Sequence, residues 1–216
     1  MAAKILLASS NAGKLREFQV LAKESPLPLR FDLFPGFDSI PEFEESAPTF
    51  AENSLGKALY YSQRTGNAVI ADDSGLVVPG LGGRPGVLSA RYAGVGATSE
   101  QRIEKLLGEM NGLAGTERAA HFVCAISLVR QNRALAVITA RADGEISLTR
   151  RGNGGFGYDP IFFFPALKKS FAELAAEEKN KPGSGEIREQ TKGVEERPGP
   201  SKNRSEARRH DSQGFG

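Results

Sequence analysis

A short polar segment near the N-terminus has the residue types of a phosphate-binding loop. Ser9-Ser10-Asn11-Ala12-Gly13-Lys14 lies between the apolar run Lys4–Ala8 and residues that recur at helical spacing. Backbone N–H groups at a helix start, a small turn and a lysine together form a cradle for an anion. The spacing is not that of a Walker A loop, and any strand–helix turn uses such residues. The segment alone is therefore a weak indication of phosphate binding.

Two adjacent carboxylates follow a short apolar strand. Asp72-Asp73-Ser74-Gly75 comes directly after Ala68–Ala71, and we expect the strand to end there. Ligands of open α/β sheets bind at the carboxyl ends of strands, and neighbouring anions repel each other unless a cation neutralises them. Magnesium prefers oxygen ligands. Taken in isolation, the segment is better interpreted as an Asp-rich turn that caps the strand.

A second pair of carboxylates, Glu44-Glu45, precedes a predicted helix that carries Asn53 and Lys57. The two helix residues are four apart and therefore share one face. Acidic residues before a helix usually serve its dipole, and a helix lysine is usually solvated. A role in chemistry requires these groups to face the strand end at Asp73.

The segment Gly154–Pro160 combines closely spaced glycines with two aromatic residues. Glycine lets the backbone approach a ligand closely, and Phe156 and Tyr158 offer faces on which a base could stack. The alternative is a tight loop with its aromatic side chains in the core.

Strands and helices alternate early in the chain and hairpins come later, which predicts a mixed α/β fold. Thr49 and Glu52 form a capping-box pattern for a helix to about Arg64, and Ser170 and Glu173 form another for a helix to about Lys179. The remaining expected elements are a helix around 103–110, strands at 29–34, 119–129, 134–142 and 161–164, a turn at 131–132, an ordered loop over 79–96, and a hairpin at Asp143-Gly144 leading into 145–149.

Composition narrows the class of protein. The chain has 216 residues, 39% of them hydrophobic, which is enough for a globular core. No apolar run approaches the roughly 18 residues that span a bilayer, and the N-terminus lacks a signal-peptide pattern, so we expect a cytoplasmic protein. The lone Cys124 forms no internal disulfide. Residues 1–179 are formally neutral, because eight of the 28 basic and six of the 26 acidic residues lie from Asn180 onward. A neutral body gives no case for nucleic-acid binding.

Taken in order, the motifs resemble those of the inosine/xanthosine triphosphate pyrophosphatases over about residues 3 to 180. The matching segments are Ser9–Lys14, Phe50–Asn53 with Lys57, Ala71–Leu76, Gly83–Val87 with Ser89–Tyr92, Gly154–Pro160 and Glu177–Asn180.

The resemblance implies two α/β lobes around a central cleft, with a mixed sheet and flanking helices, usually as a homodimer. It implies magnesium-dependent hydrolysis of ITP, dITP and XTP to the monophosphate and pyrophosphate. Asp73 would be the catalytic carboxylate, and Asp73 and Glu45 would hold the metal. The implied substrate-binding residues are Ser9, Ser10, Asn11, Ala12, Gly13, Lys14, Lys57, Ser74, Phe156, Gly157, Tyr158, Asp159 and Lys179.

The chain departs from that family near its end. The family continues with a Ser-His-Arg motif that reads the base, and no such motif occurs in this sequence. We interpret residues 1–180 as the pyrophosphatase domain and 181–216 as an atypical, disordered polar tail, and we hypothesise that the tail is out of frame.

Three alternatives to an active purine enzyme follow. The chain could bind nucleotide with impaired turnover, because the base-reading motif is missing. It could hydrolyse other nucleoside triphosphates. Its tail could bind RNA, although the interleaved acids and scarce aromatic residues argue against that.

Overall fold

The computed structural model describes residues 2–174 and 190–191 and contains one mixed β-sheet. The strand order is β2-β1-β3-β4-β5-β6-β7, and β8 also pairs with β5. Strand β1 is parallel to β2 and β3, whereas the later pairs are antiparallel. The strands are β1 (Ala3–Leu7), β2 (Leu29–Leu33), β3 (Ala68–Val77), β4 (Ala119–Arg130), β5 (Arg133–Ile146), β6 (Phe162–Phe164), β7 (Lys169–Ser170) and β8 (Gln190–Thr191). The predicted α/β fold with a mixed sheet is confirmed.

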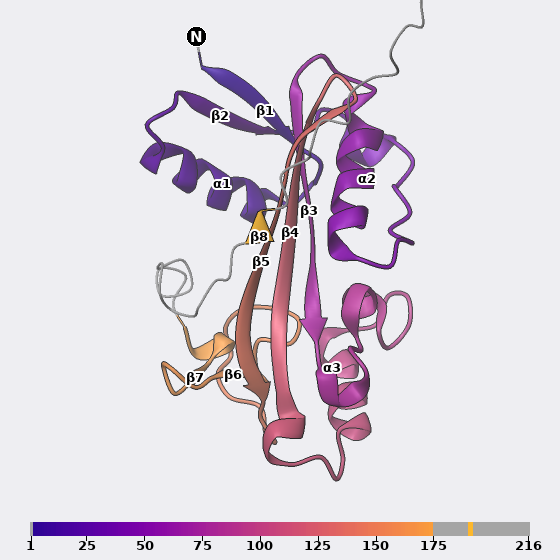
Figure 1. Cartoon of the computed structure of the whole chain (residues 1–216), viewed down its shortest axis with the longest axis vertical. Helices are drawn as coiled ribbons and strands as arrows, with labels where there is room; N and C mark the ends of the chain where they lie inside the picture. The colour runs from indigo at the N-terminus through magenta and orange to yellow at the C-terminus, as the bar shows by residue number, and fades with distance from the viewer. Residues whose placement is uncertain (1, 175–189, 192–216) are drawn as a thin grey trace, which may run out of the picture.

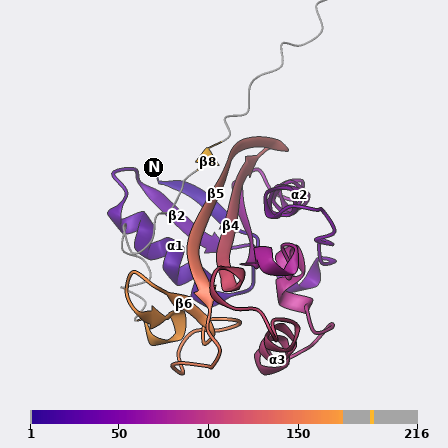
Figure 2. The same cartoon turned by 60° about the horizontal axis from the view of Figure 1, so that its bottom comes forward.

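Helices α1 (Ala12–Glu24) and α2 (Phe50–Ser62) cover opposite faces of the sheet at one end (Figures 1 and 2). Alternate residues of β3 pack on the α1 side and on the α2 side of the sheet. Ile70 packs in the cluster that includes Phe18 of α1, whereas Val69 and Ala71 pack in the cluster of α2 residues Ala58 and Tyr61. Period-two alternation of a strand therefore places consecutive residues of β3 in two different cores.

A third core lies at the other end of β3 and forms the second lobe. Leu76 and Val78 pack there against Ile103 and Leu106 of helix α3 (Ser99–Glu109) and against Phe162. Figure 1 shows the long strands β3, β4 and β5 running through both ends of the molecule. Because the strands are continuous, they fix the two lobes relative to each other.

The predicted end of the strand at Ala71 is wrong. Strand β3 continues through Asp72–Gly75 to Val77 and pairs with β4 along that whole stretch. The antiparallel neighbour supplies backbone hydrogen-bond partners that a turn would otherwise have to replace. Asp72 and Asp73 consequently point to opposite faces of the sheet instead of sharing a turn.

The predicted hairpin at Asp143-Gly144, and with it the strand over 145–149, is also wrong. Strand β5 runs without a break to Ile146 and pairs with β4 across this segment. A Cβ atom on Gly144 would lie 2.6 Å from the Phe162 ring, so the glycine permits close packing of β6. The predicted turn at Gln131-Asn132 is confirmed, with both residues at positive φ.

The remaining predicted elements fall partly within residues 2–174, where the structure tests them, and partly beyond Leu174. The helix after Thr49, the helix around Ile103 and the ordered loop after Pro79 are confirmed. Ser170 and Glu173 do form a capping box, but it opens the three-residue 3-10 helix Phe171–Glu173, and Leu174 is extended. The predicted helix beyond Leu174 and most of the predicted tail lie outside the described residues, apart from Gln190-Thr191, which pair with β5.

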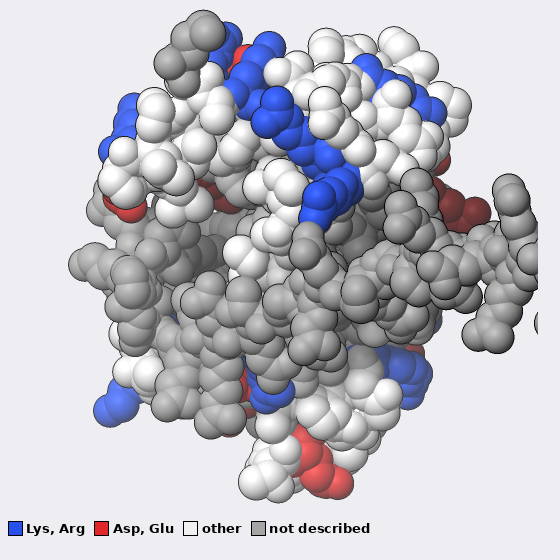
Figure 3. All heavy atoms as spheres, turned by 45° about the horizontal axis from the view of Figure 1, so that its top comes forward, with Lys and Arg blue, Asp and Glu red and all other residues white. Residues whose placement is uncertain are grey.

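Basic side chains gather on one face of the described part of the molecule (Figure 3). Figure 3 brings forward the end of the molecule at the top of Figure 1, where basic side chains form a band between largely uncharged atoms. Lys4 and Arg30 on neighbouring strands both pair with Asp32, each at 3.2 Å. None of the helices among the described residues is long and apolar enough to cross a membrane.

Candidate active site

The loop Ser9–Lys14 joins β1 to α1 and is shaped by Asn11. The Asn11 side chain caps the helix, accepting hydrogen bonds from the backbone N–H of Gly13 (2.7 Å) and Lys14 (3.3 Å). The Asn11 N–H in turn donates to Ser9 Oγ at 3.0 Å. Ser10, Asn11 and Ala12 are exposed. The loop therefore presents a helix N-terminus to solvent, as a phosphate cradle requires.

Lys14 links this loop to β3. Its Nζ lies 2.6 Å from Asp72 Oδ2. The Asp72 carboxylate is 8% exposed, and its Oδ1 has no hydrogen-bond partner. The lysine is thus held at the strand from which the next residue, Asp73, projects to the other face.

Asp73 faces α2, as the helix motif requires. Asn53 Nδ2 donates to Asp73 Oδ2 at 3.0 Å. Burial and the negative charge of Glu45 raise the pKa of Asp73 to about 6, although the Asn53 hydrogen bond and the charge of Lys57 oppose the rise. A carboxylate with a pKa near neutrality is typical of functional sites.

Glu45 and Lys57 form an ion pair beside Asp73, with Glu45 Oε1 2.8 Å from Lys57 Nζ. Burial lowers the pKa of Lys57, but the hydrogen bond and charge of Glu45, together with the charges of Asp72 and Asp73, raise it above its usual value. Lys57 therefore carries its positive charge at neutral pH, one helical turn from Asn53.

The second lobe holds Glu45 through its backbone. Arg91, in the 3-10 segment Gly86–Arg91, donates from Nη2 to the Glu45 carbonyl oxygen at 2.6 Å. Glu45 is thus tied to both lobes, through Lys57 on one side and Arg91 on the other.

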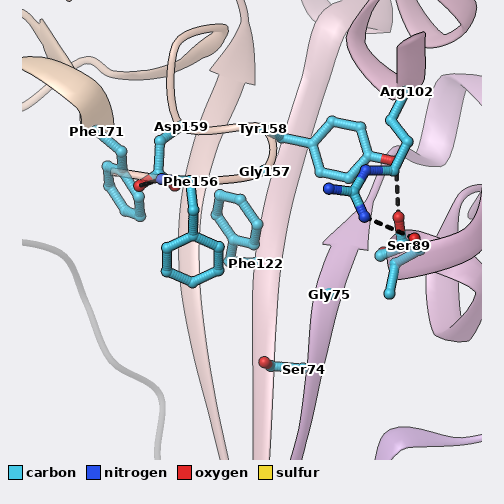
Figure 4. A pocket seen from close by; sticks show the side chains of 11 residues that line it. Ser74, Gly75, Ser89, Arg102, Phe122, Phe156, Gly157, Tyr158, Asp159 and Phe171 are labelled. Atoms are coloured by element: carbon cyan, nitrogen blue, oxygen red, sulfur yellow. Dashed lines mark hydrogen bonds between the residues drawn. The ribbon is translucent and has the colours of Figure 1, made fainter. Parts of the chain in front are cut away.

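An aromatic pocket of about 350 Å³ begins at Ser74, the residue after Asp73 (Figure 4). This volume is at the lower end of ligand pockets, which span about 300–1,000 Å³. Phe156 is 83% exposed at its mouth, whereas Tyr158 is buried and donates from its hydroxyl to the Ser89 carbonyl oxygen at 3.0 Å. The other residues that line the pocket are Ser74, Gly75, Ser89, Ala90, Arg102, Phe122, Gly157, Asp159 and Phe171.

Most of the site residues predicted from the sequence lie in the Ser9–Lys14 loop, around Asp73 or in the aromatic pocket. The structure adds Asn53 as the partner of Asp73, Arg91 as the partner of Glu45, and Arg102, Phe122 and Phe171 in the pocket wall. For Asn53 the sequence carried a signal, because its four-residue spacing from Lys57 places both on one face of the helix. Arg102 and Phe122 carried no signal, because one resembles a solvated helix residue and the other a core residue of a strand. Lys179 lies outside the described residues.

Comparison with known proteins identifies the family. The model of the Ham1 family matches residues 5–184. The chain belongs to the Ham1 family. It is 48% identical over 177 residues to the dITP/XTP pyrophosphatase of Geobacillus kaustophilus, covering 82% of this chain and 86% of the relative. A Ham1 protein structure from Coxiella burnetii matches with a TM-score of 0.75 at 40% identity, covering 82% of this chain and 90% of that one.

A second Ham1 structure, from Staphylococcus aureus, has a TM-score of 0.73 at 39% identity, over 82% of this chain and 88% of that one. The Ham1 match ends at residue 184, so residues 185–216 lie beyond it. The polar tail identified in the sequence therefore begins close to where the family pattern ends.

Proposed function

We propose that this Ham1 protein hydrolyses the non-standard purine nucleoside triphosphates ITP, dITP and XTP to the monophosphate and pyrophosphate. The observation that carries the proposal is the meeting of Asp73, Asn53, Lys57 and Glu45 on one face of the sheet, between the Ser9–Lys14 loop and the aromatic pocket. Relatives named as dITP/XTP pyrophosphatases at 48% and 45% identity support the same reaction.

The positions of the cations suit a triphosphate. Lys14 pairs with Asp72, and Lys57 lies close enough to Asp72 and Asp73 to interact with the charges of both, so the two cations flank the same two residues of β3. Phosphoryl transfer depends on positioning and on neutralising charge around the reacting phosphate. The exposed N-terminus of α1 adds the positive end of the helix dipole, and the pocket takes the base.

Asp73 is the group suited to orient the attacking water. With a pKa of about 6 it is ionised at neutral pH yet basic enough to accept a proton from water in the transition state. Asn53 fixes the carboxylate by donating to Oδ2. The side chain is half-buried, so it can reach both the substrate and solvent.

Magnesium is part of the proposal, and the donor set fits it. Glu45 and Asp73 are hard oxygen donors whose mutual repulsion raises the pKa of Asp73, and a cation between them would relieve that repulsion. No cluster of three or more His, Cys, Asp or Glu ligands occurs within residues 2–174 and 190–191. Glu45 and Asp73 would hold the ion, and the ion would supply positive charge to the phosphates.

The test is pyrophosphate release from dITP and from dGTP with magnesium, with Asp73→Asn as the control. Release from dITP that is lost in the control supports the proposal. Binding of ITP without release by the folded protein would instead favour the alternative of a nucleotide-binding protein with impaired turnover. Release from pyrimidine triphosphates only would point to a different substrate class.

A homodimer in the cytoplasm completes the proposal. The large apolar side chain of Leu135 on β5 is 52% exposed, and a subunit contact would bury it. Cys124 is a free thiol, which agrees with a reducing compartment. Sedimentation of the purified chain tests the dimer, and a monomer at micromolar concentration would contradict it.

A further inference from the structure

The wall of the aromatic pocket contains one cation. Of the residues that line it, Arg102 alone is basic. Arg102 Nη1 donates to the Ala90 carbonyl oxygen at 2.6 Å, and Nη2 donates to Ser99 Oγ at 3.0 Å. Its Nε is buried and has no partner. Within the described part of the chain these two neutral acceptors are the only hydrogen-bond partners of the guanidinium, which lies beside the Tyr158 ring in Figure 4.

The other polar groups of the pocket are already used to build it. Ser89 Oγ accepts from the Leu76 N–H at 2.9 Å and donates to the Gly86 carbonyl oxygen at 2.6 Å. The Tyr158 hydroxyl donates to the Ser89 backbone, and Asp159 Oδ2 accepts from the Phe156 N–H at 3.3 Å. Arg102 is different, because its bonds to Ala90 and Ser99 use two of the five N–H groups of a guanidinium.

We infer that Arg102 is a specificity-determining residue that donates to the oxo edge of a 6-oxopurine base stacked in this pocket. The inference rests on the proposed function and names the group that reads the base. A guanidinium is a donor only, so it matches the oxygen of hypoxanthine, xanthine or guanine at position 6. It offers nothing to the amino group that adenine carries there. Arginine pairs with the O6 and N7 acceptors of guanine by the same geometry in other proteins.

The position of Arg102 gives this contact its strength. The bonds to Ala90 and Ser99 fix the guanidinium before the base arrives, so little side-chain entropy is lost on binding. Phe122, Phe156 and Phe171 surround the pocket with apolar surface, which weakens competition from water. A base without an acceptor at this edge would leave the remaining N–H groups of the arginine desolvated and without a partner.

The experiment compares kcat/KM for ITP and for ATP in the wild type, Arg102→Leu and Arg102→Lys. We expect Arg102→Leu to lower the ITP-to-ATP ratio about tenfold to a hundredfold, the usual size of a good base contact. Arg102→Lys, which keeps a charged donor without the planar fork, should retain an intermediate ratio. Arg150→Gln is the matched control, since Arg150 also contacts α3, through the Glu100 carbonyl oxygen, but lies outside this pocket; it should leave the ratio unchanged.

If Arg102→Leu lowers kcat/KM for ITP and ATP by the same factor, the ITP-to-ATP ratio is unchanged. That result would overturn the inference and leave Arg102 a structural residue. Binding of inosine and adenosine monophosphates by calorimetry keeps the test separate from hydrolysis. If the wild type prefers the inosine nucleotide and Arg102→Leu does not, the inference stands even when no triphosphate is hydrolysed. If the leucine variant fails to fold, the ITP-to-ATP ratio of Arg102→Lys, measured below its melting temperature, decides the result. An intermediate ratio supports the inference, and a wild-type ratio overturns it.

Discussion

Asn53 donates a hydrogen bond to Asp73 from a position where its own side chain is fully buried. The same amide accepts from the Ala47 N–H at 2.9 Å and donates to Asp73 Oδ2 at 3.0 Å. One side chain of α2 thereby holds both the loop that follows Glu45 and the carboxylate of β3. The charged groups of the candidate site are oriented by a neutral residue.

Asp73→Asn should abolish most pyrophosphate release while leaving the fold intact. Removal of a general base commonly costs about 10²–10⁴ in kcat. Initial rates with dITP measure the loss. Asp143→Asn, an exposed carboxylate on β5, is the matched control and should retain wild-type activity. Equal activity in the two variants would remove Asp73 from the mechanism.

The same substitution should stabilise the protein at neutral pH when divalent cations are absent. The folded-state pKa of Asp73 is about 6, above its ordinary value of 3.8, so the folded chain binds more protons than the unfolded chain between these values. Ionisation of Asp73 therefore destabilises the fold as pH rises from about 4 to above 6. After a discount for its partial exposure to solvent, the penalty is about 1 kcal/mol.

Melting in EDTA at two pH values measures this effect. Asp73→Asn should melt above the wild type at pH 7.5 and at the same temperature near pH 3.8. A lower melting temperature at pH 7.5 would show that burial and Glu45 do not strain this carboxylate.

Arg91→Ala should weaken magnesium activation more than it weakens folding. Arg91 holds the backbone of Glu45, so its loss would let a proposed metal ligand move. Outer partners of metal ligands are commonly worth about tenfold or more in metal affinity. The magnesium concentration for half-maximal activity measures the change. Arg84→Ala removes an ion pair to Glu109 inside one lobe and should leave that concentration unaltered; parallel shifts in both variants would count against the prediction.

The buried serine pair between α2 and β4 should show a non-additive loss of stability. Ser54 Oγ and Ser127 Oγ lie 2.7 Å apart, and both residues are fully buried. Ser54→Ala leaves the Ser127 hydroxyl unpaired, at a cost of about 1–3 kcal/mol. Removing both hydroxyls leaves no orphan, so the double alanine variant should lose less than the sum of the single variants in urea unfolding. Strict additivity would show that the pair is not coupled.

The sequence predicted the positions of most site residues because loops and caps carry local signals. The polar segment after Lys4–Ala8 and the capping residue Thr49 each identify a boundary from adjacent residues alone. The path of β3 and β5 could not be predicted that way. Asp72–Gly75 and Asp143-Gly144 have the composition of turns, and only the long pairing with β4 holds both in strands.

The aromatic pocket was predicted only in part for a related reason. Phe156 and Tyr158 lie in a glycine-rich loop whose composition invites attention. Phe122 and Arg102 come from a strand and a helix whose patterns are those of ordinary structural elements. Their convergence depends on how the second lobe packs, which no local pattern encodes.

The continuous pairing of β3 with β4 has a consequence for which sequence changes this protein can tolerate. Each residue from Val69 to Val77 has a partner on β4. A single insertion or deletion between Val69 and Asp72, with the pairing before it kept, would exchange the faces of Asp72 and Asp73, so that Lys14 would meet the wrong carboxylate and Asn53 would lose its partner. Length variation among descendants of this sequence should therefore be confined to its loops. This strand should change by substitution only.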